Sequence, residues 1–459
     1  MYRHRFHPSL LREYDIRGIV GETLFKADAV AVGRGFGAQV MRDGGRCVAV
    51  GYDGRLSSPD LEDALVKGLT ASGIDVIRIG LTPTPMLYFA VHELGVDGGI
   101  QVTGSHNPPS HNGFKMMAGQ RSFFGDRIQQ LGKDVSAGDL TSGDGQVEFV
   151  DVFDVYIDRI TRDFAGSREI DVAWDAGNGA AGPAMEAVAA RIPGRQHCLY
   201  SEIDGNFPNH HPDPTIPENL VDLIRTVREG GYEIGIGFDG DGDRIGVVDG
   251  LGRIIWGDQI LQFLAADVLR RHPGATIISD VKSSQLLFDE IGRLGGKPLM
   301  WRTGHSLIKD KMIETEAPLS GEMSGHIFYK DKFYGHDDAL YVAIRLLDIL
   351  AKSKSTMSEW RDCIPTTFTT PEVRFDCADE AKFDVVARVA ADLSATDMDV
   401  DTTDGVRVNR EGGWWLLRAS NTQAVLVARA EARSAELLEE LKEDIRRYLE
   451  RGGINAPSF

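Results

Sequence analysis

The sequence has few cysteines and no long apolar run. Its four cysteines are far apart in a chain of 459 residues and show neither metal-ligand spacing nor the disulfide framework of a secreted domain. No uncharged apolar stretch of about 18 residues occurs, and the start, MYRHRFHPSLLREYDIRG, lacks an apolar leader. We therefore expect reduced cysteines, a cytoplasmic location and no membrane span.

Positive charge is also in short supply. The chain has 50 Lys and Arg against 69 Asp and Glu, a formal net charge of -19. This balance opposes broad attraction to nucleic acid or to an anionic membrane, so any anion site must gather its cations locally. With 42% hydrophobic and 26% charged residues the composition is that of an ordinary globular protein. At about 100 to 200 residues per domain, the length predicts roughly three or four domains and a cleft between them.

A strand, helix and strand pattern occurs three times. Residues 47–51 read as a buried strand, 59–72 as an amphipathic helix and 74–79 as the next strand. Similar units begin at 170–174 and 275–280, whereas the last part combines alternating strands with a long helix over 435–451. The pattern predicts three similar α/β domains with mixed sheets plus a C-terminal α+β domain, arranged around a central active-site cleft. The expected domains are 1–150, 151–253, 254–366 and 367–459.

The stretch VTGSHNPPSHNGFK, from Val102 to Lys115, places Ser105 between a glycine and a histidine, just before two prolines. Ser, Asn, Gly and Pro are turn residues, so the stretch is compatible with an ordinary surface turn. A reactive hydroxyl, however, needs a backbone that holds its oxygen in place. The local pattern leaves both interpretations open.

The stretch FDGDGDR places Asp239, Asp241 and Asp243 at alternate positions between glycines. Alternate side chains of an extended segment share a face, so the three carboxylates can converge on one hard cation, with Mg²⁺ as the natural candidate. A calcium EF-hand needs Gly and Glu where this chain has Arg244 and Gly250, which excludes that motif. A solvated acidic turn is the remaining alternative, and Arg244 suits either an anionic substrate or neutralisation of the loop.

Two further polar loops offer groups for a sugar phosphate. GEMSGH, from Gly321 to His326, brings together a carboxylate, a hydroxyl and an imidazole, although a buried turn has the same composition. RASNTQ, from Arg418 to Gln423, offers a guanidinium, hydroxyls and backbone N–H groups that can wrap a phosphate or close a hairpin. Asp337 and Asp338 are expected to cap a helix that begins at Ala339 rather than to bind a metal.

In family order, REYDIRG, TGSHNP, DGDGDR, GEMSGH and RASNTQ resemble the motifs of the α-D-phosphohexomutase superfamily, most closely its bacterial phosphomannomutase/phosphoglucomutase branch. The resemblance covers essentially the whole chain. It implies that Ser105 carries a phosphoryl group and that Asp239, Asp241, Asp243 and the Ser105 phosphate bind Mg²⁺. Glu322, Ser324 and His326 would hold sugar hydroxyls, and the nonreacting phosphate would lie against Arg418, Ser420, Asn421 and Thr422. The remaining residues that match functional positions are Tyr14, Arg17, His106, Lys115, Arg244, Lys282 and His305.

The resemblance implies reversible transfer of phosphate between O1 and O6 of mannose and glucose phosphates, through a hexose 1,6-bisphosphate that reorients in the site. Glucose 1,6-bisphosphate is the expected activator. Met323 resembles the mannose/glucose branch, because glucosamine mutases usually carry a polar residue there. Lys115 is the favoured proton-transfer group, with His106 and His305 as alternatives. Phosphoglucosamine mutase, a Mg²⁺-dependent sugar phosphatase and a noncatalytic sugar-phosphate sensor remain as other functions, and we expect a monomer.

Overall fold

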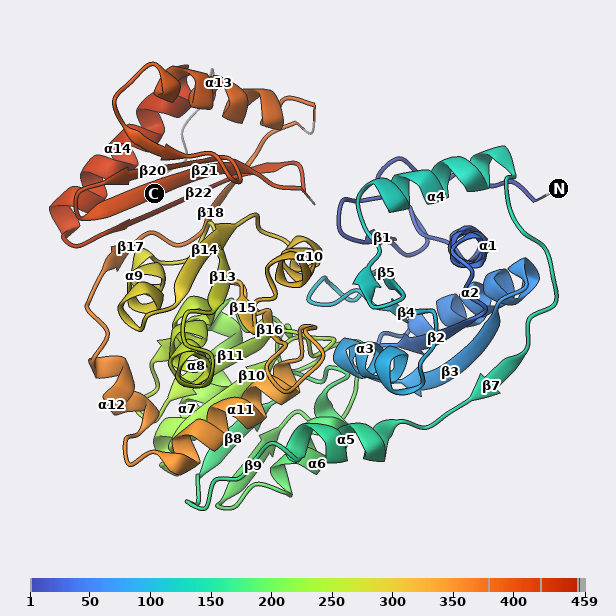
Figure 1. Ribbon diagram of the computed structural model, residues 1–459, viewed down its shortest axis with the longest axis horizontal. Coiled ribbons are helices and arrows are strands. Elements are labelled where there is room, and N and C mark those ends of the chain that lie inside the picture. Colours follow the sequence, from blue (N-terminus) through green and yellow to red (C-terminus); the bar gives the residue numbers. More distant parts are fainter. Residues whose placement is uncertain (1, 379, 422, 452–453, 455–459) are drawn as a thin grey trace.

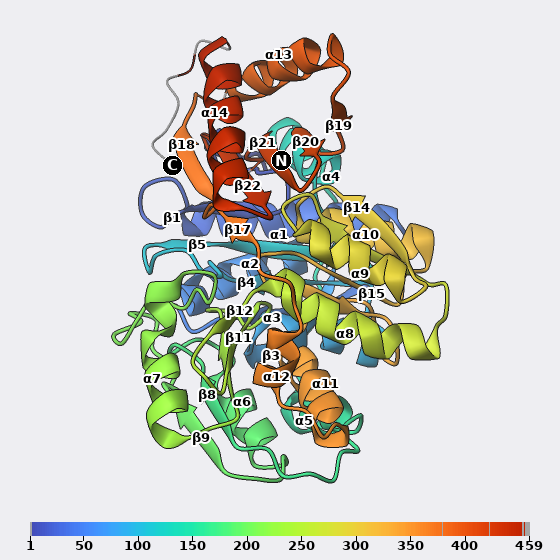
Figure 2. The ribbon, with the colours of Figure 1, turned by 90° about the vertical axis from the view of Figure 1, so that its left-hand side faces the viewer.

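The computed structural model describes residues 2–378, 380–421, 423–451 and 454, which form four successive sheets (Figure 1). In both views the second domain and the fourth domain lie at opposite ends of the molecule with the third domain between them, and Figure 1 shows the first domain to the right of the others (Figures 1 and 2). Within the described residues, no helix combines the length and the apolar character that crossing a membrane requires. All four cysteines are free.

The first sheet has seven strands in the order β1-β5-β4-β2-β3-β7, with β6 paired to β5. Parallel pairing joins β2 to β3, β2 to β4 and β3 to β7, whereas β4–β5 and β1–β5 are antiparallel, so the sheet is mixed. The strands are β1 (Ile16–Ile19), β2 (Cys47–Tyr52), β3 (Asp75–Leu81), β4 (Gly98–Val102), β5 (His111–Ala118), β6 (Arg121–Ser122) and β7 (Val147–Phe149). The helices of this domain are α1 (Lys26–Arg42), α2 (Ser58–Ser72), α3 (Thr84–Glu93) and α4 (Asp126–Ala137).

The second sheet is also mixed, in the order β12-β11-β10-β8-β9. It consists of β8 (Val172–Asp175), β9 (Gln196–Leu199), β10 (Ile234–Phe238), β11 (Ile245–Asp249) and β12 (Ile254–Ile255). Its helices are α5 (Phe153–Thr161), α6 (Gly182–Ala189), the short 3₁₀ turn η1 (Pro217–Leu220) and α7 (Val221–Gly230). The division expected near residue 253 falls inside this sheet, because β12 pairs with β11.

The third sheet has the order β14-β13-β15-β16 and is again mixed. Its strands are β13 (Thr276–Asp280), β14 (Lys297–Trp301), β15 (Leu319–Gly321) and β16 (Ile327–Tyr329). The helices are α8 (Gly257–Arg271), α9 (Gln285–Arg293), α10 (His305–Thr315), α11 (Ala339–Lys352) and α12 (Met357–Asp362). Helix α11 is apolar and buried nearly all round, and it contacts α5, α6 and β11 of the second domain. One apolar cluster therefore runs through all of the first three domains.

The fourth sheet is antiparallel, in the order β17-β22-β21-β20-β19, with β18 paired to β22. It consists of β17 (Phe368–Thr369), β18 (Val373–Asp376), β19 (Asp399–Asp401), β20 (Val406–Arg410), β21 (Gly413–Ala419) and β22 (Val425–Ala432). Helices α13 (Lys382–Ser394) and α14 (Ala435–Arg451) cover one face of this sheet and enclose a separate apolar cluster (Figure 1). The prediction of three mixed α/β domains and a C-terminal α+β domain is confirmed.

The four motif loops occupy equivalent places in their sheets. Each loop connects two neighbouring antiparallel strands: β4 to β5, β10 to β11, β15 to β16 and β21 to β22. In the first three domains the leading strand of the pair also joins a parallel strand on its other side. The loops therefore leave the carboxyl ends of these strands, where ligands bind in α/β sheets.

Candidate active site

The motif loops of the four domains meet through direct polar contacts. The Ser105 hydroxyl donates to Asp239 Oδ2 at 2.9 Å, which joins the first loop to the second. Arg244 Nε donates to His326 Nε2 at 2.9 Å, which joins the second loop to the third. The Asn421 amide reaches the Tyr14 hydroxyl, which in turn donates to the Thr303 carbonyl at 2.7 Å. These contacts connect residues of all four motif loops.

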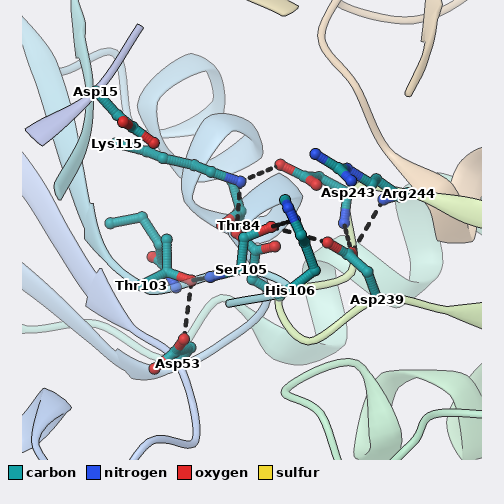
Figure 3. Close-up of polar contacts among 12 residues, drawn as sticks. Asp15, Asp53, Thr84, Thr103, Ser105, His106, Lys115, Asp239, Asp243 and Arg244 are labelled. Carbon is teal, nitrogen blue, oxygen red and sulfur yellow. Dashed lines mark hydrogen bonds and ion pairs between the residues drawn. The ribbon is translucent and has the colours of Figure 1, made fainter. Parts of the chain in front are cut away.

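Ser105 lies at the centre of this site in a backbone conformation that few side chains adopt. The backbone φ of Ser105 is 50°, in the left-handed region, and the residue is 1% exposed to solvent. The Ser105 N–H donates to Thr103 Oγ1 at 2.8 Å, and the ring of His106 places Nδ1 3.2 Å from Ser105 Oγ (Figure 3). Such a conformation persists only where the surroundings hold it, and it is found most often at functional sites. The surface-turn alternative is therefore disfavoured for this loop.

The three aspartates of the second loop are fully buried and close together. One carboxylate oxygen from each of Asp239, Asp241 and Asp243 lies within 4.8 Å of the others. Lys115 from β5 donates to Asp241 Oδ2 at 2.7 Å and also to Asp243 Oδ2 (Figure 3). Thr84, at the first position of α3, donates to Asp241 as well. The triad is consequently linked to three segments of the first domain: the serine loop, α3 and β5.

The pKa values of the buried aspartates are shifted in opposite directions by burial and by neighbouring charges. The pKa of Asp239 is raised well above its ordinary value by burial and by the negative charges of Asp241 and Asp243. For Asp241 burial acts in the same direction, but the Lys115 ammonium and the hydrogen bonds from Lys115 and Thr84 outweigh it, so its pKa is lowered. For Lys115, burial lowers the pKa because it disfavours the charged ammonium, but the negative aspartates outweigh burial and raise the pKa. The site thus holds Lys115 as an ammonium.

The aspartate triad fits a divalent cation. Two buried oxygens, Asp241 Oδ1 and Asp243 Oδ1, have no hydrogen-bond partner among the described residues. Buried carboxylate oxygens without partners are costly unless a cation neutralises them, and carboxylate oxygens are the ligands that Mg²⁺ prefers. The donor set therefore matches the expected metal.

A second buried group adjoins the triad through Asp243. His326 Nδ1 lies 3.0 Å from Asp337 Oδ2 and 3.5 Å from Asp243 Oδ1, while its Nε2 accepts from Arg244. Asp337 also accepts from Lys309 Nζ at 3.0 Å. Although burial opposes ionisation, Lys309 and His326 lower the pKa of Asp337 far below its usual value. The Lys309 ammonium thus places a positive charge directly against the Asp337 carboxylate.

The expectation that Asp337 and Asp338 both cap α11 is half right. Asp338 is the N-cap of that helix and accepts from the Tyr341 N–H at 2.9 Å. Asp337 instead lies in the site, with Oδ2 3.0 Å from His326 Nδ1. Residue spacing predicts a cap correctly but does not tell which of two adjacent carboxylates provides it.

His305 lies at the first position of α10, and its ring stacks on that of His326, with centroids 5.4 Å apart. Burial is the main cause that lowers the pKa of His305, and the positive charge of Lys309 adds to it. The pKa of His106 is lowered in the same way, by burial and then by Arg244 and Arg17. Both imidazoles are therefore neutral at neutral pH and able to accept a proton.

The third loop presents its polar groups in a fixed arrangement. Glu322 Oε1 accepts from the Gly304 N–H, and Oε2 accepts from the Ser324 hydroxyl at 3.0 Å. The Met323 N–H donates to Asp280 Oδ1 at 3.2 Å, and its sulfur contacts Arg429 Nη1. Glu322 thus connects the GEMSGH loop to the start of α10. This places its carboxylate beside the Thr303–Gly304 segment that Tyr14 also contacts.

Cations of the third and fourth domains lie next to acidic partners. Arg418, at the end of β21, donates through Nε to Asp404 Oδ2 at 2.9 Å, and Lys282 Nζ lies 3.1 Å from Glu372. Ser420 Oγ accepts from the Gln423 N–H at 3.2 Å. Thr422, the last predicted phosphate-binding residue, lies outside the described residues.

The remaining predicted residues come from the N-terminal segment. Arg17 in β1 donates to Asp15 Oδ2 at 2.6 Å and to Asn107 Oδ1, so it joins the first strand to the serine loop. Burial is the main cause that raises the pKa of Tyr14, which keeps its hydroxyl protonated as a donor to Thr303. Both side chains therefore reach the site from β1 and the residues before it.

Sequence reasoning missed a set of residues that support the serine loop. Asp53 accepts from Thr103 Oγ1 at 2.8 Å and from the Gly104 N–H at 3.2 Å, and Arg55 donates to the Ser105 carbonyl at 2.6 Å. The available signal was the polar segment DGRLSS, which directly follows the buried strand over 47–51. Polar groups after a buried strand mark the loop edge of an α/β sheet, and the same rule pointed to the other loops. Thr84, between two prolines after β3, carries the same signal.

Comparison with known families gives four consecutive matches. The models described as phosphoglucomutase/phosphomannomutase, alpha/beta/alpha domains I, II and III match residues 8–138, 154–252 and 256–368. The model of the C-terminal domain of the same proteins matches residues 372–448. Together these matches span most of the chain.

Individual proteins agree with the family models over their full length. The phosphomannomutase/phosphoglucomutase of Pseudomonas putida is 46% identical over 441 residues, 96% of this chain and 95% of that protein. The phosphoglucomutase of Neisseria gonorrhoeae is 43% identical over 448 residues, 96% of each chain. A crystal structure of a phosphoglucomutase/phosphomannomutase family protein from Burkholderia thailandensis superimposes with a TM-score of 0.93 at 44% identity, covering 98% of this chain and 99% of that one.

Proposed function

Because the chain belongs to the phosphoglucomutase/phosphomannomutase family of α-D-phosphohexomutases, we propose that it moves phosphate reversibly between O1 and O6 of mannose and glucose phosphates. The observation that carries this proposal is the position of Ser105: a buried hydroxyl, held in a left-handed backbone conformation, 2.9 Å from a triad of buried aspartates. Relatives named phosphomannomutase/phosphoglucomutase at 45–46% identity support both substrates.

The two sugar oxygens are too far apart for a direct shift, so the phosphoryl group needs a carrier. Phosphorylated Ser105 donates to the free hydroxyl of the hexose monophosphate: the bond from phosphorus to Ser105 Oγ breaks and a bond to the sugar oxygen forms. The hydroxyl proton passes through the proton-transfer group to Ser105 Oγ. The product is a hexose 1,6-bisphosphate, which turns around. Ser105 then takes back the other phosphoryl group and a proton returns to the sugar, so the phosphoserine is restored and no water is consumed.

The chain's own cations offset the charge of this transfer. Phosphoserine carries about -1.5 to -2 charges near neutral pH, and phosphoryl transfer depends mainly on positioning and electrostatics. Lys115 from β5 contacts two of the aspartates, and Arg17 from β1 contacts Asn107 of the serine loop, so both would stabilise the transferring group. Mg²⁺ held by Asp239, Asp241, Asp243 and the phosphate on Ser105 would add positive charge and polarise the phosphorus.

Proton transfer is assigned to Lys115, with His106 and His305 as alternatives. The raised pKa of Lys115 makes it an ammonium in this arrangement, the form that returns a proton to the leaving sugar oxygen. The neutral imidazoles of His106 and His305 have the form that accepts a proton.

Sugar and phosphate recognition is assigned to the third and fourth domains. In the third domain, sugar hydroxyls would form hydrogen bonds with Glu322, Ser324 and His326, and Met323 favours the mannose/glucose branch. The phosphate remote from the reaction would be held by Lys282 together with four residues of the RASNTQ loop: Arg418, Ser420, Asn421 and Thr422. Tyr14 would close the site beside Asn421. We further propose that glucose 1,6-bisphosphate activates the enzyme and that the protein is a monomer. We also propose a cytoplasmic location, which accords with the four free cysteines.

The test is conversion of mannose 1-phosphate and glucose 1-phosphate to their 6-phosphates by the purified protein, with Mg²⁺ and a trace of glucose 1,6-bisphosphate. We expect conversion of both sugars and loss of activity in Ser105→Ala. Product analysis by ³¹P NMR separates the alternatives: inorganic phosphate indicates a phosphatase, and conversion of glucosamine phosphate alone indicates the glucosamine branch. Absence of conversion with every sugar, despite phosphorylated Ser105, would favour the sensor.

A further inference from the structure

Arg55 is the most completely enclosed cation of the first domain. It follows β2, is 1% exposed and donates to four backbone carbonyls of a single segment. The acceptors are the carbonyls of Ser105 and Asn107 at 2.6 Å each, Pro108 at 2.6 Å and His111 at 2.9 Å. The remaining guanidinium N–H, on Nε, donates to Asp53 Oδ2 at 3.1 Å. A planar group with fixed donors thus holds the entire turn that follows Ser105.

Asp53 extends this support to the other side of Ser105. Its carboxylate accepts from Thr103 Oγ1, from the Gly104 N–H and from the Ser58 hydroxyl. Thr103 Oγ1 then accepts from the Ser105 N–H at 2.8 Å. Both peptide groups of Ser105 are therefore bound, its N–H through Thr103 to Asp53 and its carbonyl to Arg55.

The same arrangement leaves no room for a side chain at position 104. A Cβ on Gly104 would lie 2.4 Å from Arg55 Cζ, far inside van der Waals contact. The guanidinium is covered on another side by the ring of Phe207 from the second domain, 5.4 Å from Arg55 Cζ. Arg55 is thus packed tightly against the loop on one side and against a neighbouring domain on the other.

These contacts have an electrostatic consequence for a phosphorylated serine. The four carbonyls turn their negative ends toward Arg55, while Ser105 Oγ points to Asp239 (Figure 3). Burial is the main cause that lowers the pKa of Arg55, and the charge of Asp53 opposes it. Arg55 also interacts electrostatically with Arg17 and Asp241, so its positive charge acts on groups inside the site. A cation behind the loop offsets part of the negative charge that a phosphoryl group brings.

From this geometry we infer that Arg55, anchored by Asp53, is a positioning residue for phosphoryl transfer: it fixes the left-handed conformation of Ser105 and draws the loop carbonyls away from the phosphoryl group. The inference rests on the proposed role of Ser105 as carrier. Arg55 touches neither sugar-binding nor phosphate-binding loop residues of the third and fourth domains in the contacts described above. Its loss should therefore lower kcat and leave KM nearly unchanged.

The experiment compares Arg55→Met with a matched control, Arg78→Met. Arg78 lies in the same domain and donates to Glu62, which is buried, so its loss costs stability without touching the serine loop. A misplacement of about 1 Å costs about 100-fold in rate, and we expect a fall in kcat of that order for Arg55→Met only. Guanidinium ion added to Arg55→Ala should restore part of kcat. Equal kcat values in the wild type and Arg55→Met would overturn the inference, as would an equal fall in both Met variants.

Hydrogen exchange of the amides of residues 104–112 tests the same inference without relying on activity. We expect faster exchange there in Arg55→Met than in the wild type or Arg78→Met. If the wild type converts no sugar phosphate but this loop alone loses protection, the proposed function fails while the positioning role of Arg55 stands. Unchanged protection in Arg55→Met would overturn the positioning role, whatever the activity of the wild type.

Discussion

At the scale of single residues, the charge of Lys115 is determined by its neighbours rather than by its burial. Lys115 is 3% exposed, a setting that by itself favours the neutral amine. The contacts to Asp241 and Asp243 reverse this preference and keep the ammonium form. A single side chain therefore balances the aspartate triad and lies beside the proposed phosphoryl carrier.

Replacing Lys115 by Met tests its two roles separately. We expect Lys115→Met to abolish turnover, because the variant can neither transfer a proton nor stabilise the phosphoryl charge. Mg²⁺ binding should be retained or strengthened, because the aspartates lose a competing cation. Steady-state kinetics and calorimetric titration with Mg²⁺ measure the two effects. Near-normal turnover in this variant would exclude Lys115 as the proton-transfer group.

His92, outside the site, gives a prediction about stability and pH. Its ring stacks on Tyr334 with centroids 4.7 Å apart and lies 5.8 Å from His336, and burial followed by the charge of His336 lowers its pKa from 6.5 to about 4. Between these two values the unfolded chain binds a proton that the folded chain does not, so folding stability decreases as the pH falls through this window.

We expect His92→Gln to lose that part of the pH dependence. The free energy of unfolding of the wild type and the variant, measured by urea denaturation, should differ by an amount that shrinks as the pH falls from 6.5 toward 4. Replacement of the exposed His197 by Gln is the control. A difference that is constant across this window would contradict the assignment.

At the scale of elements, a set of side-chain-to-backbone contacts joins the fourth domain to the third. Arg407 in β20 stacks on Trp414, with Cζ 3.8 Å from the ring centroid, and donates to the carbonyls of Val281 and Ser283 at 2.8 and 2.9 Å. Burial is the main cause that lowers the pKa of Arg407, to about 10. The loop that carries Lys282 is therefore held by a residue of another domain.

Arg407→Met should loosen this junction. The two carbonyls lose their donors, and an unsatisfied buried polar group costs about 1–3 kcal/mol. We expect a decrease in stability of that order and a higher KM for sugar phosphates, because the loop that carries Lys282 loses its support. Phosphorylation of Ser105 by glucose 1,6-bisphosphate should proceed at saturation, since the first two domains are intact. Unchanged KM would show that Arg407 does not position Lys282.

The sequence predicted the helices and strands better than it predicted which of them pack against one another. Periodicity located the three βαβ units, and the predicted helix over 435–451 has the bounds of α14. It did not reveal that α11 packs on the second domain, because a helix that is apolar on all sides indicates burial but not against what. Motif composition identified Ser105 and the aspartates as candidates. Arg55 lies in the polar segment DGRLSS, which marks the loop edge of the sheet, but its partners could not be predicted because they are backbone carbonyls, which every residue has.

At the scale of the whole molecule, the site depends on how the fourth domain meets the first. The Tyr14 hydroxyl receives a hydrogen bond from Asn421 and donates to Thr303, so one oxygen connects three domains. Hydrogen bonds of this kind each contribute only about 0.5–1.5 kcal/mol. Such a small contact is easily broken and re-formed, as a site that must admit a substrate and retain a turning bisphosphate requires.

We therefore expect the fourth domain to close on ligand. In small-angle X-ray scattering, glucose 1,6-bisphosphate added to Ser105→Ala, which cannot be phosphorylated at residue 105, should reduce the radius of gyration relative to the free protein. The Tyr14→Phe variant should show a weaker effect, because it lacks the hydroxyl that joins the domains. An unchanged radius of gyration in the presence of saturating ligand would exclude closure.

The contact between Tyr14 and Asn421 joins residues 407 positions apart in the chain. Its formation therefore has a consequence for biosynthesis. Ribosomes make the first domain, with Ser105 as the proposed phosphoryl carrier, long before they make the RASNTQ loop, which we propose holds the remote phosphate. A nascent chain that still lacks this loop cannot form the contact between Asn421 and Tyr14, whichever other parts have folded. Full mutase competence thus arises only when translation is almost complete.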